Sequence, residues 1–359
     1  MYTIAILPGD GIGIEVTNEA VKVLKRIDEK FDIDFRFKYA LIGGSAIDEA
    51  GVALPNETKE VCDKSDAILL GAVGGPKWEN LPPEEQPERG GLLPLRKHFN
   101  LFINIRPIKV YNSLKDISPI KNRIIDKGVD FLIFRELTGG LYFSTPKYIS
   151  DDRSFAIDTM KYTAKEIKRI AKVAFQAARL RNKRITSIDK ANVLSTSLLW
   201  REIFINLQKN EFSDIELDHL YVDNAAMQII RDPARFDIIV TENMFGDILS
   251  DESAVLCGSL GLLASASIGE RSFGLYEPVH GSAPDIYGQN KANPIGAILS
   301  VALMLRYSFN RDDLAIKIEK AVEHVLNENY ATLDIFVDKN KQKLVSTDKM
   351  GDLIINNIS

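Results

Sequence analysis

The sequence has little cysteine, little histidine and no long apolar run. Its 359 residues include two cysteines and four histidines. Two cysteines cannot build a disulfide framework or a cysteine-rich zinc site, and such scarcity is typical of a reducing cytosol. No stretch approaches the roughly 20 apolar residues that span a bilayer, and no basic and apolar N-terminal regions indicate a signal peptide. We therefore expect a soluble, cytoplasmic protein.

The sequence also lacks a strong excess of charge of one sign. There are 50 acidic and 45 basic residues, a formal net charge of -5, and the basic residues are scattered. This distribution gives no reason to expect a nucleic-acid partner or a membrane partner. The hydrophobic content of 45% and the length of 359 residues predict a globular chain with two domains.

Short apolar runs alternate with helical patterns along the chain. Each run has the length of a buried strand, and the helical segments show apolar residues at helical spacing. The predicted strands cover residues 2–7, 66–73, 129–136, 184–193, 219–225 and 236–240, with an alternating strand at 33–39, and the predicted helices include 56–63, 92–99 and 163–180. This alternation predicts an α/β fold whose strands are mainly parallel. A loop rich in Pro and Glu, 78–87, is expected to act as a cover.

A glycine-rich turn follows the first predicted strand. The spacing Gly9-x-Gly11-x-Gly13 does not match the dinucleotide-binding pattern G-x-G-x-x-G. Asp10 would also put a negative charge where a pyrophosphate should lie. We therefore interpret this segment as a tight turn between a strand and a helix.

The stretch 241–252 contains the clearest candidate for a metal site. Asn243 and Gly246 suit a strand-to-helix turn, and helix is expected after Gly246. On a helix, Asp247 and Asp251 are four residues apart and share one face. Two carboxylates at the carboxyl end of a buried strand suit Mg²⁺ or Mn²⁺. The alternative is a solvated acidic helix face.

Further charged residues stand at the ends of other predicted strands or alone in apolar segments. Arg96, Arg106 and Arg135 stand in apolar surroundings, and arginine is the preferred partner of a carboxylate. Together with Asp223 and the two aspartates above, they indicate a small polyanionic substrate chelated to a cation. Lys190 is then a candidate for proton transfer, as is Tyr142. For each arginine taken alone, a structural salt bridge is the alternative.

The block 277–286, followed by 290–296, is rich in Gly, Ser, Ala and Pro. Backbone groups of such a loop, with His280 and Asn293, could bind an adenine nucleotide. Asp285 is a suitable acceptor for a ribose hydroxyl, the role that an acid has in NAD sites generally.

Segments spread along the chain resemble those of a known family. The segments LPGDGIG, GAVGGPKW, LLPLRKHFNLFINIRP, RELTGGLYF, DKANVL, VDNAAMQ, NMFGDILSDE, GSLGLL, EPVHGSAPDI, ANPIG and STDKMGD occur in family order. They are similar to those of the β-decarboxylating dehydrogenases, which include the isopropylmalate, isocitrate, homoisocitrate and tartrate dehydrogenases. The resemblance implies an isopropylmalate/isocitrate dehydrogenase-like fold with mixed, mainly parallel sheets, which is not a standard Rossmann fold.

The resemblance also implies two domains and a dimer. The first, NAD-binding domain would be discontinuous, 1–101 with 258–359, and the second, 102–257, would carry the dimer interface and the metal and substrate site. Each active site of the homodimer would be shared between subunits, since Lys190 and Asp223 would reach over from the partner chain. The reaction would be metal-dependent, NAD⁺-linked oxidation and decarboxylation of 3-isopropylmalate. The alternatives are tartrate, D-malate or homoisocitrate as substrate, or a non-catalytic regulatory subunit, which would have lost residues that this sequence keeps.

Roles follow residue by residue from the same resemblance. Lys190 would assist removal of the hydroxyl proton, and Tyr142 would protonate the enol. Asp223 would be a third catalytic residue beside them. Mg²⁺ or Mn²⁺ would bind Asp223, Asp247 and Asp251. The substrate would contact Leu92, Leu93, Arg96, Arg106, Arg135, Val193 and Asp223. NAD would contact Glu88, Asn192, His280, Gly281, Ser282, Ala283, Asp285, Ile286 and Asn293. Two departures from the family pattern, Ser144 and the segment 329–343, are not among these residues.

Overall fold

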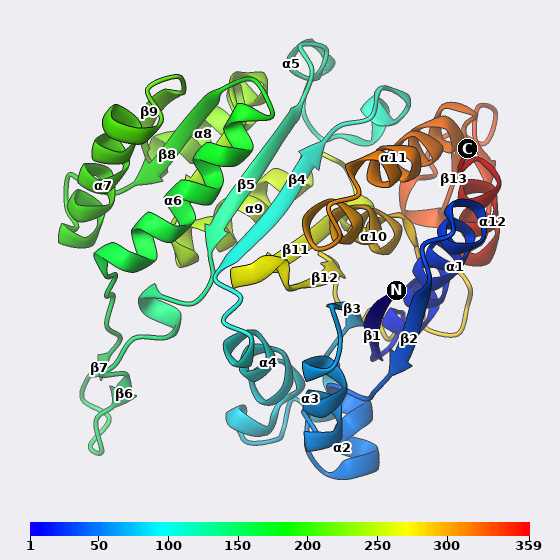
Figure 1. The fold of residues 1–359 in the computed structure, drawn as a ribbon, viewed down its shortest axis with the longest axis horizontal. Helices are drawn as coiled ribbons and strands as arrows, with labels where there is room; N and C mark the ends of the chain where they lie inside the picture. The colour runs from blue at the N-terminus through cyan, green and yellow to red at the C-terminus, as the bar shows by residue number, and fades with distance from the viewer. The chain divides into compact units, whose positions relative to one another are not determined.

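The computed structural model describes residues 1–359 except for the side chain of Arg271. The chain divides into two compact units (Figure 1). Unit 1 comprises Met1–Leu101, Tyr111–Ser118 and Cys257–Ser359, and unit 2 comprises Phe102–Val110 and Pro119–Leu256. Each unit contains its own run of adjacent strands. The roles predicted for the two domains, cofactor binding and dimerisation, stay predictions.

The strands of unit 1 follow the order β2-β1-β3-β12-β11. Strand β1 is parallel to β2 and β3, β12 is parallel to β3, and β11 is antiparallel to β12. The bounds are β1 Tyr2–Gly9, β2 Phe35–Tyr39, β3 Ala67–Ala72, β11 Ala264–Ile268 and β12 Gly274–Pro278. A separate pair of short strands consists of β13 Tyr330–Ala331 and β14 Lys343–Leu344.

Two sets of helices pack on the strands of unit 1. Helices α1, α10, α11 and α12 contact one another, and α1 and α10 also contact the strands, whereas α2 and α3 contact β1. The bounds are α1 Gly13–Phe31, α2 Gly44–Ala50, α3 Asn56–Asp63, α4 Leu93–His98, α10 Ile295–Tyr307, α11 Asp312–Asn327 and α12 Thr347–Asn356. The apolar residues at helical spacing in α1, which include Val16, Ala20, Val23, Leu24 and Ile27, are fully buried. This burial confirms the predicted core face of the first helix.

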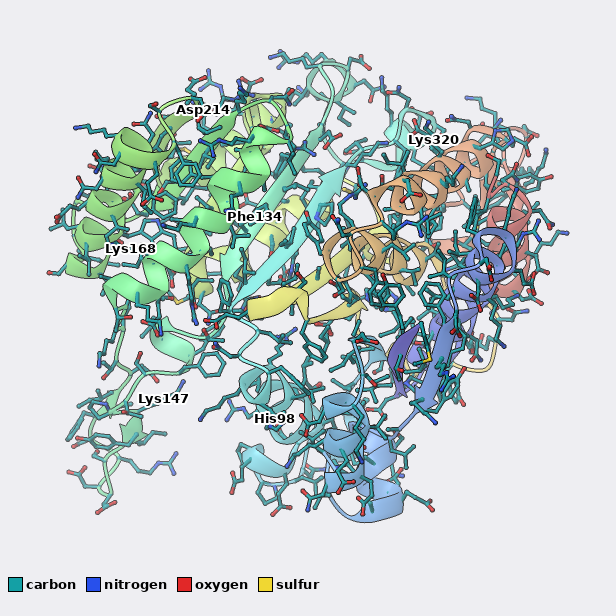
Figure 2. All side chains as sticks on the ribbon, in the orientation of Figure 1. His98, Phe134, Lys147, Lys168, Asp214 and Lys320 are labelled. Atoms are coloured by element: carbon teal, nitrogen blue, oxygen red, sulfur yellow. The ribbon has the colours of Figure 1, made fainter. Side chains whose placement is uncertain are left out.

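The strands of unit 2 follow the order β4-β5-β10-β8-β9. Strands β4 and β5 are antiparallel, while β5, β10, β8 and β9 are parallel neighbours, so their carboxyl ends meet at one edge. The bounds are β4 Ile103–Lys109, β5 Asp130–Glu136, β8 Arg184–Asp189, β9 Glu216–Tyr221 and β10 Ile238–Thr241. Phe134 lies fully buried on β5 (Figure 2). Active sites of open α/β sheets lie at such an edge.

Helices cover both faces of the unit 2 strands. Helices α6 and α7 pack against each other, as do α8 and α9, and each pair contacts the strands (Figure 1). The bounds are α5 Asn122–Ile125, α6 Ala164–Arg179, α7 Ser195–Glu211, α8 Val222–Arg231 and α9 Asn243–Val255. Thr163 and Glu166 form a capping box at the start of α6, as expected for a helix that begins with this Thr-x-x-Glu pattern. A hairpin of β6 Tyr148–Ile149 and β7 Ala156–Ile157 extends from this unit, with Lys147 at its base (Figure 2).

The predicted α/β class with mixed, mainly parallel strands is confirmed. Several local predictions were wrong, and the strand expected at 184–193 ends at Asp189. The strand expected at 33–39 begins only at Phe35, and its outer residue Tyr39 is 56% exposed, because β2 lies at the edge of the unit 1 strands. The segment 78–87, predicted as a plain loop, overlaps three short helical turns, Pro76–Trp78, Pro83–Glu85 and Pro87–Leu92. The strand expected at 219–225 ends at Tyr221, where α8 follows. No helix in the described part of the chain is long and apolar enough to cross a membrane.

Candidate functional site

Helix α9 carries two of the three predicted metal ligands, Asp247 and Asp251. It begins at Asn243, four residues earlier than expected, because the Glu242 carboxylate caps it by accepting the backbone N–H groups of Met244 and Phe245. Asp247 and Asp251 therefore stand one turn apart inside the helix, as their spacing predicts. Both carboxylates are accessible, with side chains 33% and 66% exposed.

Gly246 does not form the predicted turn. It lies within α9, where a Cβ atom would come within 2.7 Å of the Arg135 side chain. The absent side chain lets Arg135 lie against the helix with only 7% of its side chain exposed. There Arg135 pairs with the Asp247 carboxylate through Nη1. The glycine is required for this close approach and not for backbone conformation.

The second arginine of unit 2 contacts the next turn of α9. Arg106 Nη1 donates to the Asp251 carboxylate at 2.6 Å and to the Ser250 hydroxyl at 2.7 Å. Its Nη2 lies 3.9 Å from Asp247. The arginines of β4 and β5 thus face the two aspartates of α9, and the structure brings together four residues that the sequence placed in one site.

Tyr142 completes this group. It ends a short turn, Gly140–Tyr142, and its hydroxyl donates to Asp247 Oδ2 at 3.0 Å. The Arg135 guanidinium lies 5.8 Å from the centre of its ring. Burial raises the pKa of Tyr142, and the negative charge of Asp247 raises this pKa further. The phenol therefore keeps its proton at neutral pH, as a proton donor must.

Lys190 and Asp223 form a second group in unit 2. Lys190 follows the end of β8, and Asp223 lies in the first turn of α8 and not on a strand as expected. Their side chains pair directly, and the Lys190 ammonium lowers the pKa of the Asp223 carboxyl. Among the described residues of one chain, no three His, Cys, Asp or Glu side chains form a group that could hold a metal ion. One chain thus does not gather Asp223, Asp247 and Asp251 into one ligand set.

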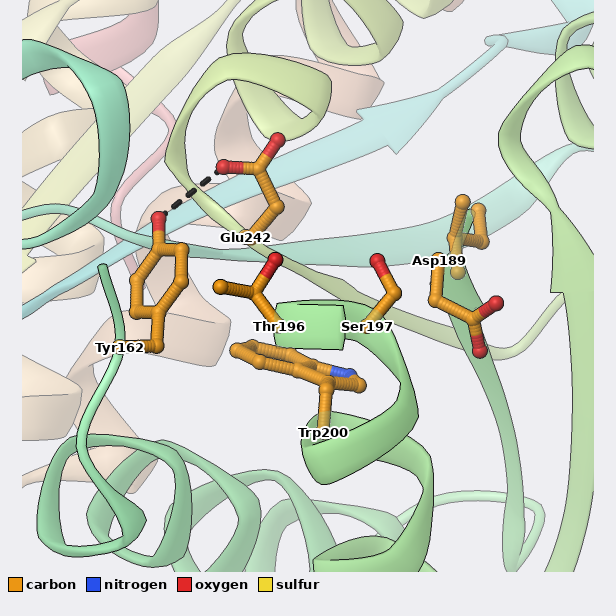
Figure 3. A pocket seen from close by; sticks show the side chains of 7 residues that line it. Tyr162, Asp189, Thr196, Ser197, Trp200 and Glu242 are labelled. Atoms are coloured by element: carbon orange, nitrogen blue, oxygen red, sulfur yellow. Dashed lines mark hydrogen bonds between the residues drawn. The ribbon is translucent and has the colours of Figure 1, made fainter. Parts of the chain in front are cut away.

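A buried network beneath α9 was missed by the sequence analysis. The Tyr162 hydroxyl donates to Glu242 Oε2 at 3.0 Å and accepts the Asn243 backbone N–H at 3.0 Å. Tyr162 and Glu242 line a pocket with about 10 Å³ of room, enough for roughly one water molecule, together with Ile188, Asp189, Thr196, Ser197 and Trp200 (Figure 3). Burial raises the pKa of Glu242. An acidic residue between a predicted strand and a predicted helix is the signal that would have indicated this cap.

The charge at the end of β5 has a structural role. Glu136 is fully buried and accepts the backbone N–H of Gly139 at 2.7 Å and that of Thr138 at 3.1 Å. Arg169 pairs with it at 3.2 Å. These contacts hold the turn that leads to Tyr142, so Glu136 supports a predicted site residue without facing the site.

In unit 1 the third predicted arginine has an acidic partner. Arg96, on α4, donates to Glu277 Oε1 at 2.6 Å. The side chains of this pair are 14% and 11% exposed. The half-buried leucines Leu92 and Leu93 lie about one turn before Arg96 in the same helical segment. The structure thus places two apolar side chains and a paired cation on one short segment.

The glycine-rich segment of unit 1 is a tight turn between β1 and α1, as its sequence predicts. The buried Asp10 carboxylate accepts backbone N–H groups of Gly44, Ser45 and Gly74 at 2.7–2.8 Å. Gly11 has a φ of +53°, and a Cβ atom there would lie 2.1 Å from the Ser282 carbonyl oxygen. Both glycine properties, the positive φ and the lack of a side chain, are therefore used here.

The same turn holds the loop predicted to bind adenosine. Ile12 donates its N–H to the Ser282 carbonyl at 2.8 Å, and the Ser282 hydroxyl donates to the Gly74 carbonyl at 2.7 Å. His280 Nε2 is buried and has no hydrogen-bond partner. Asn293 is oriented by Asp334, which accepts from its Nδ2 at 3.0 Å, so the atypical segment 329–343 supports a predicted cofactor contact.

The remaining predicted residues lie on loops and turns. Asp285 is exposed. Glu88 is exposed as well, and its carboxylate lies beside Gly74, where a Cβ atom would come within 2.0 Å of it. Asn192 and Val193 are exposed in the turn after β8. The others, in the loop after β12, are Gly281, Ala283 and Ile286.

The chain is similar to known proteins along nearly its whole length. A family model described as isocitrate/isopropylmalate dehydrogenase matches residues 3–354. The chain is 54% identical over 355 residues to 3-isopropylmalate dehydrogenase of Clostridium acetobutylicum, which covers 99% of this chain and 98% of the relative. It is 56% identical over 351 residues to that of Thermotoga maritima, covering 98% of this chain and 97% of the relative. Isocitrate dehydrogenase from Methylococcus capsulatus has a similar structure, with a TM-score of 0.86, 33% identity and coverage of 100% of this chain and 99% of that one.

Proposed function

The chain belongs to the isocitrate/isopropylmalate dehydrogenase family, and from this premise we propose that it oxidises and decarboxylates (2R,3S)-3-isopropylmalate. The products are 4-methyl-2-oxopentanoate and CO₂, with NAD⁺ as oxidant, in leucine biosynthesis. The observation that carries the proposal is the group of two arginines, two aspartates and one tyrosine at the carboxyl edge of the unit 2 strands. Identities of 54% and 56% to relatives named for this activity support isopropylmalate as the substrate.

The residues fit a hard divalent cation. Asp247 and Asp251 present carboxylate oxygens from one helix face, and such oxygens are the ligands that Mg²⁺ and Mn²⁺ prefer. Asp223 is 62% exposed on α8, so its carboxylate can serve as a third ligand at a site completed by a second chain. When bound, the cation would polarise the substrate hydroxyl and the ketone formed from it.

The loop after β12 fits the adenosine half of NAD. His280 Nε2 is a buried polar atom without a partner, and Asp285 offers an exposed carboxylate as an acceptor. Backbone groups of the loop are held in place by the turn of Asp10. NAD⁺ bound there would accept the hydride.

Several predicted site residues have a separate role in the proposed reaction. Arg96, Arg106 and Arg135 bind the carboxylates of the malate, because a guanidinium can donate two parallel hydrogen bonds. Lys190 takes up the proton of the hydroxyl group as the ketone forms. Tyr142 then delivers a proton to the carbon that has lost CO₂. Burial and Asp247 raise the pKa of Tyr142, so its proton is available for this step.

We further propose a homodimer in which two chains form each site. Unit 2 exposes large apolar side chains on α8, on α9 and on its hairpin, a pattern that marks interaction surfaces. They are Tyr148, Ile149, Phe155, Met227, Ile230, Ile248 and Val255. In such a dimer, the pair Lys190–Asp223 of one chain lies beside the aspartates of its partner.

The decisive experiment is a comparison of substrates. NADH formation is measured with 3-isopropylmalate, D-malate, tartrate, homoisocitrate and isocitrate, each with Mg²⁺ and with Mn²⁺. We expect kcat/KM for isopropylmalate to exceed that for isocitrate by at least about a hundredfold, because Leu92 and Leu93 would meet an unpaired third carboxylate.

Matched variants give the control. Asp247→Asn should abolish turnover, while Asp232→Asn, which removes an exposed partner of Lys127 in the same unit, should not. Equal or better turnover of isocitrate would contradict the assignment, and preference for another acid would identify the substrate among the relatives of isopropylmalate.

A further inference from the structure

Arg106 and Arg135 each make a contact of the same kind that the proposed reaction does not use. Arg106 Nε donates to the side-chain oxygen of Asn104 at 3.0 Å. Arg135 donates to the side-chain oxygen of Asn243 through Nε at 3.0 Å and through Nη2 at 2.8 Å. In each case a neutral amide oxygen binds the Nε edge of the guanidinium, and the Nη1 atom contacts an aspartate of α9.

Both asparagines are buried. Asn243 has no exposed surface, and Asn104 is 1% exposed. A guanidinium can only donate hydrogen bonds, so the amide must turn its oxygen toward the arginine. Asn243 is held in that orientation, because its Nδ2 donates to the Gly139 carbonyl at 3.0 Å and its backbone N–H to Tyr162 at 3.0 Å.

The strand register puts Asn104 between the two arginines. It lies two residues before Arg106 on β4, and successive residues alternate between the faces of a strand, so both side chains are on one face. In the antiparallel pair of β4 and β5, Asn104 stands directly opposite Arg135. One side of the sheet therefore presents Asn104, Arg106 and Arg135 as neighbours.

Such contacts limit how an arginine can move. A guanidinium on its long side chain can rotate and translate, and two parallel bonds to a carboxylate form only over a narrow range of orientations. Binding the Nε edge removes this freedom before the substrate arrives, which lowers the entropic cost of binding. A neutral acceptor does this without adding a negative charge that would compete with the substrate.

We propose that Asn104 and Asn243 are positioning residues that hold Arg106 and Arg135 in the orientation that binds the substrate carboxylates. The inference rests on the proposed function, in which these arginines contact the substrate. Neither asparagine belongs to the residues that the reaction itself requires. Their loss should thus weaken binding of the hydroxy acid and leave the cofactor unaffected.

The test uses substitutions of similar size. Asn104→Leu and Asn243→Leu remove the acceptor oxygen, while Asn104→Asp and Asn243→Asp keep one. Each Leu variant should raise KM for 3-isopropylmalate at least about tenfold, the cost of a lost bond to a charged group, with KM for NAD⁺ changed less than twofold. The Asp variants keep an acceptor but add the competing negative charge, so their KM should lie between those of wild type and of the Leu variants. Malonate affinity, measured by calorimetry, should follow KM for the hydroxy acid.

A matched control separates positioning from loss of stability. Ser187→Ala removes a buried acceptor of Trp200 on β8 and touches neither arginine. It should lower Tm without changing either KM. Unchanged KM and malonate affinity in the Leu variants, or equal losses for both substrates, would overturn the inference.

The two proposals fail in different ways. If wild type oxidises isopropylmalate but the variants bind it normally, only the positioning role is wrong. If wild type neither oxidises any of the acids nor binds malonate, the proposed function is wrong, and the positioning role is wrong with it. If one Leu variant does not fold, the other Leu variant and its Asp counterpart still decide the outcome.

Discussion

Lys190, which follows the end of β8, pairs with Asp223 of the same chain, which lies in the first turn of α8. The two aspartates of α9 instead pair with the arginines of β4 and β5. The predicted site residues of unit 2 thus form two separate groups within one chain. The proposed dimer would combine one group from each subunit into a single site.

This arrangement predicts complementation between two inactive variants. Lys190→Ala and Asp247→Ala homodimers should each be nearly inactive, because one loses the proton-transfer group and the other a metal ligand. In a mixed dimer one site receives both wild-type groups, and the other carries both lesions. Random pairing of equal amounts makes about half of the dimers mixed, so activity should recover to about a quarter of wild type if pairing is unbiased.

The measurement is NADH formation after the two variants are unfolded, mixed and refolded. The control mixes Asp247→Ala with Asp251→Ala, since both lesions lie on α9 and every site then lacks a ligand. If the Lys190→Ala and Asp247→Ala mixture stays inactive although mass spectrometry detects heterodimers, each site is built from one chain.

Asp285 predicts the choice of cofactor. Its exposed carboxylate should accept the ribose 2′-hydroxyl of NAD and repel the 2′-phosphate of NADP. Like charges brought together can cost several kcal/mol, so kcat/KM should favour NAD by at least about tenfold, or about 1.4 kcal/mol. Asp285→Lys with Ile286→Tyr should weaken or reverse this preference, whereas Asp151→Lys, at an exposed site of unit 2, should not. Equal use of both cofactors by wild type would mean that the adenosine site is elsewhere.

Asp10 should contribute to stability and not to cofactor choice. Asp10→Ala leaves three backbone N–H groups in and near the turn without their acceptor. Because unsatisfied buried donors cost about 1–3 kcal/mol each, the free energy of unfolding should fall by about 3 kcal/mol or more. Urea unfolding measures this change, and Asp66→Ala, which loses one exposed bond to Thr3, should cost less than about 1 kcal/mol. A changed ratio of NAD to NADP activity in Asp10→Ala would instead indicate a direct cofactor contact.

Glu19 predicts that stability depends on pH. Burial raises the pKa of this carboxyl to about 7, despite its pairing with Lys22 at 2.6 Å. It packs between α1 and α12, where a Cβ atom on Gly351 would lie 1.9 Å from its oxygen. The folded state therefore favours the protonated acid. The resulting stabilisation is fully present below the unfolded pKa, near 4.5, and is lost as pH rises through about 7.

The experiment compares urea unfolding of wild type and Glu19→Gln between pH 5 and pH 8. The difference in unfolding free energy between the two proteins should change by up to about 3 kcal/mol over this range, with wild type losing stability as pH rises. Glu29→Gln, at an exposed position on the same helix, is the control and should leave the pH dependence unchanged. A constant difference between wild type and Glu19→Gln would mean that Glu19 ionises normally in the folded protein.

Local patterns in the sequence predict most of the elements. The helix 56–63 and the capped helix that begins after Thr163 match the structure, because apolar spacing and caps act over a few residues. The shared face of Asp247 and Asp251 follows from helix geometry alone. The early start of α9 was missed because Asn243 and Gly246 suggested a turn, whereas the Glu242 carboxylate caps a helix that begins at Asn243.

The sequence by itself determined which residues carry charge at the strand ends, and that the fold is α/β with mainly parallel strands. Only the tertiary structure decided which of these residues meet. Arg135 and Asn243 are 108 positions apart, and Arg106 and Asp251 are 145 apart. Their contacts depend on strand order and register, which arise from packing of the whole sheet and not from local propensity. For the same reason, the buried asparagines behind the arginines stood out only once β4, β5 and α9 were adjacent.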